Sequence, residues 1–175
     1  FLTNIPIEKI NLLIQVIDKK LNCPLTSSAG RLFDAVSAIT NICVINSFEA
    51  EAPMRLEVAI AENCSDQYPY LINNVVCFDE VIKGIVNDLK NTTEASVISA
   101  KFHNTIISVI LDIAVYAKEN NNINKVVLSG GVFQNKYLLE NSERILIKNK
   151  FEVFTHCKVP SNDGGIALGQ LAIAA

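Results

Sequence analysis

The sequence predicts a helix-rich α/β domain that contains at least one pair of parallel strands. Strand-like and helix-like segments alternate through the last third of the chain, and apolar residues recur at helical spacing through most of the rest. Half of the 175 residues are apolar and 19% are charged, which is typical of a folded domain and not of a disordered chain. The length suits a single domain spanning residues 1–175.

Three helices are expected in the first part of the chain. Residues 6–21 carry an apolar stripe at helical spacing, formed by Ile10, Leu13, Ile14 and Ile17. Asn22-Cys-Pro ends this helix, because the residue before a proline avoids helical geometry. Further helices are predicted over residues 31–40 and 52–61.

A β-hairpin is expected next, from residues 70–72 and 75–78. Asn73-Asn74 lies between the two segments, and asparagine is a common residue in tight hairpin turns. Asp79 is expected to cap the helix that follows and that ends near Asn91.

The longest periodic segment, residues 94–119, is predicted to be a helix that is buried on more than one side, because its apolar residues cover a wide arc. The predicted elements after it are strand 126–128, helix 133–149, strand 151–154 and a C-terminal helix. A strand–helix–strand order favours parallel pairing of the two strands.

Charge and cysteine content exclude several classes of protein. A net charge of −3 argues against a nonspecific nucleic-acid binder, so nucleic acid is not an expected partner. The five cysteines lie at wide spacings without a C-x-x-C pair, which fits neither a zinc ribbon nor a disulfide framework. Unpaired thiols suit a reducing compartment, so a cytoplasmic location is expected.

Two observations concern targeting and completeness. No apolar run approaches 18 residues and no signal peptide is visible, so no membrane partner is expected. The chain begins with Phe1 and not with methionine, so we expect it to be an excised fragment.

The first candidate site is the turn Ser129-Gly130-Gly131, between a predicted strand and a predicted helix. Glycine lets the backbone approach a ligand closely, and a helix N-terminus offers unpaired N–H groups to negative charge. Asn135 is expected one turn into the helix, where its amide can bind a ribose or a base edge. Alternatively, the glycines serve only the geometry of a strand–turn–helix joint.

A second glycine-rich turn, Asn162-Asp163-Gly164-Gly165, precedes the last helix. Asp163 is either the N-cap of that helix or a carboxylate at a metal or phosphate site. Two such turns in the last third of one chain indicate a nucleotide site.

Four other residues have a structural interpretation, and for Arg31 and Asp34 a functional interpretation stands beside it. Arg31 and Asp34 lie on one helical face, either as a surface ion pair or as ligands of an anion and of hydroxyl groups. His103, within the long apolar segment, is interpreted as a core histidine. His156 follows a strand and is also interpreted as structural.

Five strings occur in an order that resembles the C-terminal part of the HypF carbamoyltransferase family, which matures nickel–iron hydrogenases. The strings are Thr26-Ser-Ser-Ala-Gly-Arg-Leu-Phe-Asp-Ala-Val36, Phe48-Glu-Ala-Glu-Ala-Pro-Met-Arg-Leu-Glu57, Phe102-His-Asn-Thr105, Leu128-Ser-Gly-Gly-Val-Phe-Gln-Asn135 and Val159-Pro-Ser-Asn-Asp-Gly-Gly-Ile-Ala-Leu-Gly-Gln170. The sequence is more distantly similar to the family that transfers threonylcarbamoyl to tRNA and to antibiotic O-carbamoyltransferases.

The resemblance implies one lobe of the actin/sugar-kinase/Hsp70-like (ribonuclease H-like) fold, with a small mixed sheet. It implies that ATP and carbamoyl-adenylate bind here and that the carbamoyl group passes to a C-terminal cysteine thiolate of a HypE-like acceptor. The implied nucleotide-binding residues are Arg31, Asp34, Ser129, Gly130, Gly131 and Asn135. Asp163 is implied to bind a divalent metal (Fe, Zn or Mg) that is shared with histidines upstream.

Two departures from the family pattern bear on this interpretation. The chain lacks the paired His-x-x-x-His of the family, so the isolated fragment is expected to bind metal poorly and to be inactive. Phe48-Glu-Ala50-Glu51 stands where the family has Phe-Glu-Gly-Gln, which removes a glycine from a ligand contact. The alternatives are an O-carbamoyltransferase, a tRNA-modifying relative, or a nucleotide-binding module without catalytic activity.

Overall fold

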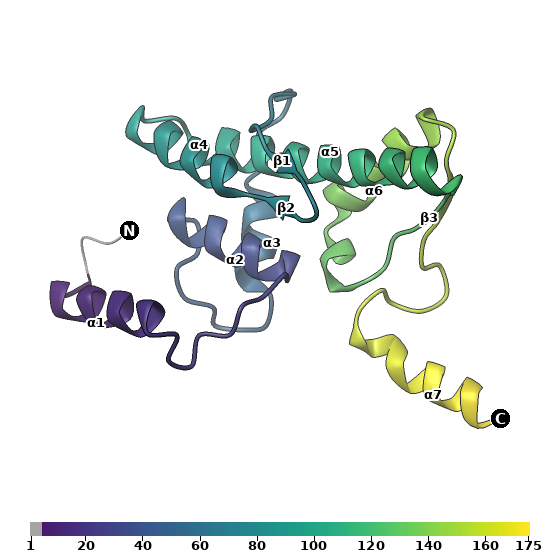
Figure 1. Cartoon of the computed structure of the whole chain (residues 1–175), viewed down its shortest axis with the longest axis horizontal. Coiled ribbons are helices and arrows are strands. Elements are labelled where there is room, and N and C mark those ends of the chain that lie inside the picture. Colours follow the sequence, from purple (N-terminus) through teal and green to yellow (C-terminus); the bar gives the residue numbers. More distant parts are fainter. Residues whose placement is uncertain (1–4) are drawn as a thin grey trace.

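The computed structural model describes residues 5–175, and Figure 1 shows the arrangement of its elements. The α-helices are α1 (Ile7–Asp18), α2 (Ala29–Ile39), α3 (Glu51–Val58), α4 (Asp79–Lys90), α5 (Ala95–Asn121), α6 (Lys136–Lys148) and α7 (Ile166–Ala174). The strands are β1 (Leu71–Ile72), β2 (Val76–Cys77), β3 (Lys125–Val127) and β4 (Glu152–Phe154). Two short 3-10 helices are η2 (Gly131–Gln134) and η3 (Asp163–Gly165). The predicted helix-rich α/β class is confirmed.

The four strands form two separate sheets. β1 and β2 form the predicted antiparallel hairpin, in which Leu71 pairs with Cys77. β3 and β4 form the predicted parallel pair, in which Val127 pairs with Phe154. The strand content is as small as expected, but the two pairs are not joined into the single mixed sheet that the resemblance implied.

Helix α5 is the central element of the fold. It packs against α4 and α6, and in Figure 1 it runs horizontally across the molecule, with α4 toward its left end and α6 toward its right end. Its buried residues join a core that draws on every helix from α2 to α6, formed by Phe33, Val36, Leu56, Tyr68, Val81, Ile85, Ile98, Phe102, Ile106, Ile107 and Leu138. The prediction that this helix is buried on more than one side is confirmed.

The apolar composition of α5 is explained by this burial. The helix is long and apolar enough to cross a membrane by length and composition, but 56% of its most apolar window is buried inside the fold. The core helix of a folded domain meets the same criteria.

Helices α1 and α7 lie at the two ends of the chain and bury no side chain within the described residues. The predicted apolar stripe of α1 is present but uncovered, with Leu13 58% and Ile17 61% exposed. In α7 the apolar residues surround the helix, and Ile173 is 90% exposed. Because a helix that is apolar all round is normally buried, α7 carries surface that the described residues leave uncovered.

Three predicted helix starts need correction. Asp79 is the first residue of α4 and makes no capping hydrogen bond. Asn135 does not lie one turn into a helix; instead it is the N-cap of α6, because the preceding residues form the 3-10 helix η2. Asn162, and not Asp163, caps the last helical segment, and its side chain accepts a hydrogen bond from the N–H of Gly164.

Ala50, which replaces the glycine of the family pattern, precedes α3 with φ 61° and ψ 18°. This is the left-handed region, which costs a residue with a Cβ about 1–2 kcal/mol. The glycine of the family pattern would therefore suit this backbone, and alanine occupies it under strain.

We expect Ala50→Gly to raise the free energy of unfolding by about 1 kcal/mol, because glycine adopts a positive φ without steric cost. Ala52→Gly is the matched control, since it lies within α3 and should lower that free energy by about 1 kcal/mol. Urea unfolding of the two variants measures both changes. A loss of stability in Ala50→Gly would show that Ala50 is not strained.

Candidate nucleotide site

Two adjoining hollows bring together three segments that are far apart in the sequence. The inner hollow, about 400 Å³, is lined by Gly30, Phe33, Ala50, Pro53, Met54, Glu57, Gly131, Val132, Gln134 and Asn135. The outer hollow, about 470 Å³, is lined by Ser28, Gly30, Arg31, Asp34, Asn46, Ser47, Phe48, Glu49, Ala50 and Pro53. Gly30, Ala50 and Pro53 line both. The two hollows therefore contain predicted site residues from α2 and from the Gly131–Asn135 segment.

Arg31 and Asp34 line the outer hollow. Arg31 Nη1 lies 3.3 Å from Asp34 Oδ2, and the Arg31 side chain is 75% exposed. Ser28 caps α2 by accepting a hydrogen bond from the N–H of Arg31, which places both side chains on the first turns of the helix. The surface ion pair is confirmed, and binding of a ligand by the same two side chains stays a prediction.

Glu51 fixes the loop that forms the opposite wall of the outer hollow. Its carboxylate accepts hydrogen bonds from the Ser47 hydroxyl at 2.7 Å and from the Ser47 backbone N–H at 2.5 Å. Arg55 lies 2.6 Å away on the next turn of α3. The hydrogen bonds from Ser47 hold the pKa of Glu51 below its ordinary value, and the charge of Arg55 adds to this effect. The carboxylate thus stays charged and anchors the strained turn at Ala50.

The two glycine-rich turns lie beside each other. The N–H of Gly130 donates to the carbonyl of Ser161 at 3.0 Å, and Gly130 has φ 104°, where a side chain would be strained. A Cβ added to Gly131 would lie 3.9 Å from the side chain of Asn162. The parallel pairing of β3 with β4 causes this proximity, because the turns follow the carboxyl ends of neighbouring strands.

Ser129 contacts His156, for which the sequence suggests only a structural role. Its hydroxyl lies 2.8 Å from Nε2 of His156, and both side chains are exposed. Ser129 follows β3 by two residues and His156 follows β4 by two, so the strand register places them opposite each other. Each residue stands just beyond a predicted strand (126–128 and 151–154), but their pairing depends on the strand register, which the sequence does not specify.

Asn135 lines the inner hollow, and the oxygen and the nitrogen of its amide each make one hydrogen bond. Its Oδ1 accepts from the N–H of Leu138 at 2.7 Å, and its Nδ2 lies 2.9 Å from Nε2 of His103. His103 is fully buried, and its Nδ1 lies 2.8 Å from the carbonyl oxygen of Ser99. The interpretation of His103 as a satisfied core histidine is confirmed.

Asp163 is exposed on η3 and is not needed as a cap. Within residues 5–175, no three His, Cys, Asp or Glu side chains are close enough to hold a metal ion together. The described residues therefore do not form a metal site by themselves. All five cysteines are free thiols, as the spacing predicted.

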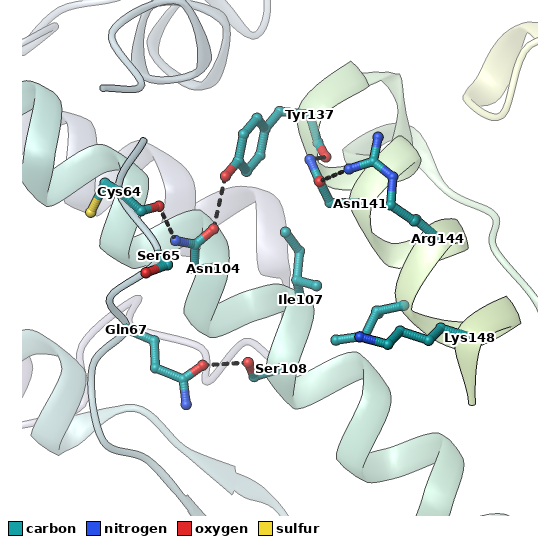
Figure 2. A pocket seen from close by; sticks show the side chains of 11 residues that line it. Cys64, Ser65, Gln67, Asn104, Ile107, Ser108, Tyr137, Asn141, Arg144 and Lys148 are labelled. Carbon is teal, nitrogen blue, oxygen red and sulfur yellow. Dashed lines mark hydrogen bonds between the residues drawn. The ribbon is translucent and has the colours of Figure 1, made fainter. Parts of the chain in front are cut away.

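A third hollow of about 400 Å³ contains none of the predicted site residues. It is a polar trough between the loop 64–67, α5 and α6, and Figure 2 shows its side chains. Asn104 donates to the carbonyl of Cys64 at 2.9 Å and accepts from the Tyr137 hydroxyl at 2.8 Å. These bonds hold the loop against the two helices.

The burial of His103 generates a pH dependence. Burial lowers its pKa from 6.5 to about 4, so the unfolded chain binds a proton at a pH where the folded chain does not. The contribution to stability is complete above pH 6.5 and is lost as the pH falls towards 4, up to about 3 kcal/mol. We expect urea unfolding between pH 7 and 4.5 to detect this loss, and His103→Gln to reduce it. An equal pH slope in the variant would contradict the assignment.

The family model described as "Carbamoyltransferase, Kae1-like Domain, second subdomain" matches residues 3–170. Among curated relatives, carbamoyltransferase HypF of Synechocystis sp. is 37% identical over 85% of this chain and 19% of its own length. Probable carbamoyltransferase HypF of Methanocaldococcus jannaschii is 33% identical over 93% of this chain and 22% of its own length. The chain thus spans about a fifth of the relatives it matches.

Solved structures agree with the sequence relatives. A full-length HypF in a phosphate- and nucleotide-bound form superposes with a TM-score of 0.90 and 40% identity, over 97% of this chain and 23% of that one. HypF of T. kodakarensis gives a TM-score of 0.79 at 21% identity, over 95% of this chain and 22% of that one, which supports the fold. The chain belongs to the HypF carbamoyltransferase family, in which it corresponds to the second subdomain of the Kae1-like domain.

Proposed function

We propose that the inner and outer hollows bind an adenine nucleotide, as ATP or as carbamoyl-adenylate. The observation that carries this proposal is that α2, the turn at Ala50 and the Gly131–Asn135 segment together line the inner hollow, which adjoins the outer one. Its volume lies within the range of small-molecule sites. A full-length HypF with 40% identity is described as nucleotide-bound, which supports the same ligand class.

The proposed reaction is transfer of a carbamoyl group to a C-terminal cysteine thiolate of a HypE-like acceptor protein. The thiolate sulfur forms a bond to the carbamoyl carbon, the bond from that carbon to the adenylate oxygen breaks, and AMP leaves with the electron pair. The acceptor supplies the nucleophile, so none of the cysteines in this chain is required as one. The role of this chain is to bind and orient the adenylate, which can supply a large part of a rate enhancement.

We further propose that Asp163 contributes one carboxylate to a divalent metal site whose other ligands lie outside the described residues. Asn162 makes the capping hydrogen bond, so the charge of Asp163 is not explained by helix stability. The carboxylate is exposed. Asp163 lies two residues after Ser161, whose carbonyl accepts the hydrogen bond from Gly130, so its turn adjoins the Gly130 turn. A bound metal would neutralise negative charge on a nucleotide phosphate.

The first test is Gly131→Val in the full-length protein. Gly131 lines the inner hollow, and a Cβ added there meets only Asn162, at 3.9 Å, so valine fits the turn and is expected to narrow the hollow. We expect ATP binding to be abolished in calorimetry while the thermal unfolding midpoint stays close to wild type. Gly169→Val is the control, because Gly169 lines neither hollow and its added Cβ meets no atom of the described residues within 4 Å. Unchanged ATP affinity in folded Gly131→Val would exclude this turn from the site.

The second test compares Asp163→Ala with Asp163→Asn. Because Asn162 is the cap, both variants should keep the thermal unfolding midpoint, and both should lose metal and slow carbamoyl transfer to the acceptor by orders of magnitude. Glu152→Gln is the control, since it neutralises another exposed carboxylate on β4. Wild-type metal content and transfer rate in both Asp163 variants would remove Asp163 from the site.

A further inference from the structure

A buried chain of hydrogen bonds connects the inner hollow to the centre of the fold. It runs from the Asn135 amide at the hollow to the imidazole of His103 and then to the carbonyl oxygen of Ser99, both on α5. The Ser99 hydroxyl donates in turn to the carbonyl of Leu56 on α3 at 2.5 Å. Each of these side chains is fully buried except Asn135, which is 9% exposed.

The chemistry of the partners fixes the direction of each bond. A carbonyl oxygen can only accept, so Nδ1 of His103 carries the proton that it donates to Ser99. The imidazole is neutral at neutral pH because burial lowers its pKa to about 4. Its Nε2 therefore has a lone pair and accepts from Nδ2 of Asn135 at 2.9 Å.

The direction of this bond determines the positions of the oxygen and the nitrogen of the Asn135 amide. The amide nitrogen must face His103, and the oxygen must face the N–H of Leu138. Rotating the amide by 180° would place its oxygen against the lone pair of His103 and its nitrogen against an N–H, so both bonds would be lost. The amide nitrogen has two hydrogens, and His103 is its only hydrogen-bond partner among the described residues.

The imidazole is itself held in place by aromatic rings. Phe33, Phe102 and Tyr137 lie with their centroids 5.2, 6.0 and 5.7 Å from that of His103, all in edge-to-face geometry. Phe33 also lines the inner hollow. These contacts hold the imidazole in one orientation, and its bond to Nδ2 of Asn135 therefore fixes the orientation of the Asn135 amide.

We propose that His103 is a positioning residue that fixes the Asn135 amide so that its second N–H offers a hydrogen-bond donor to an acceptor atom of the nucleotide. This inference rests on the proposed nucleotide site and specifies the polarity of one contact within it. Stability alone does not call for this arrangement, because the cap needs only the oxygen of Asn135. Replacing both partners of a buried hydrogen bond with apolar groups of similar shape can be nearly neutral.

Two substitutions of His103 distinguish the roles of its two ring nitrogens. Asparagine places its amide near the position of Nδ1, so His103→Asn keeps the bond to Ser99 and loses the one to Asn135. Glutamine reaches the position of Nε2, so His103→Gln restores an acceptor for Asn135. In the full-length protein we expect the Kd for ATP to rise about tenfold in His103→Asn and to stay within about threefold of wild type in His103→Gln.

Thr105→Val is the matched control for loss of a buried polar group on α5. The Thr105 hydroxyl is fully buried, donates to the backbone carbonyl of Lys101 and accepts from the N–H of Tyr68. It makes no hydrogen bond to Asn135 and does not line the inner hollow. We expect this variant to unfold at a lower temperature and to bind ATP with the wild-type Kd. In an Asn135→Ala background, His103→Asn should add no further loss of affinity, because the two residues act through one contact.

The outcomes separate this inference from the proposed function. Wild-type ATP affinity in His103→Asn, together with lost binding in Gly131→Val, would overturn the positioning role and leave the nucleotide site standing. Wild-type affinity in both variants would overturn both. If His103→Asn does not fold, Asn135→Asp decides, because it keeps the cap acceptor and lacks the donor. A wild-type Kd in Asn135→Asp would then overturn the inference.

Discussion

Burial of α5 is the constraint on which the rest of the structure depends. A helix buried on several sides must pair every polar side chain it carries, because an unpaired buried polar group costs about 1–3 kcal/mol. Ser99 bonds to the carbonyl of Leu56, Thr105 to the backbone of Tyr68 and His103 to Asn135. Each of these bonds fixes a different segment against α5. The same pairing that stabilises the core therefore sets the position of α3, of the loop before β1 and of the start of α6.

The candidate site follows from this arrangement and from one pair of parallel strands. β3 and β4 bring the two glycine-rich turns together at their carboxyl ends, and the Gly130–Ser161 bond joins those turns. α5 holds the Asn135 end of the first turn through His103. In contrast, α7 buries no side chain and packs mainly against η3 within the described residues. Its uncovered apolar surface fits a subdomain that belongs to a longer domain.

The sequence was sufficient for the type and order of the helices and strands, because apolar periodicity and glycine or asparagine breaks are local signals. It was insufficient at the helix starts. A short 3-10 helix precedes α6, which Asn135 caps, and another begins the last helical segment, which Asn162 caps. Such short turns leave no periodic signal in the sequence. The pairing of Ser129 with His156 depends on strand register, which no local pattern specifies. The strain at Ala50 became visible only through its positive φ.

Photolabelling with 8-azido-ATP shows directly whether adenine nucleotide binds in the hollows between α2, α3 and the Gly131–Asn135 segment. We expect mass spectrometry of the full-length protein to find label in peptides that contain residues 50–57 or 131–135, and excess ATP to prevent the labelling. Label confined, within this chain, to the polar trough of residues 64–67 and 144–148 would exclude binding in those hollows and would place the nucleotide between the loop 64–67, α5 and α6.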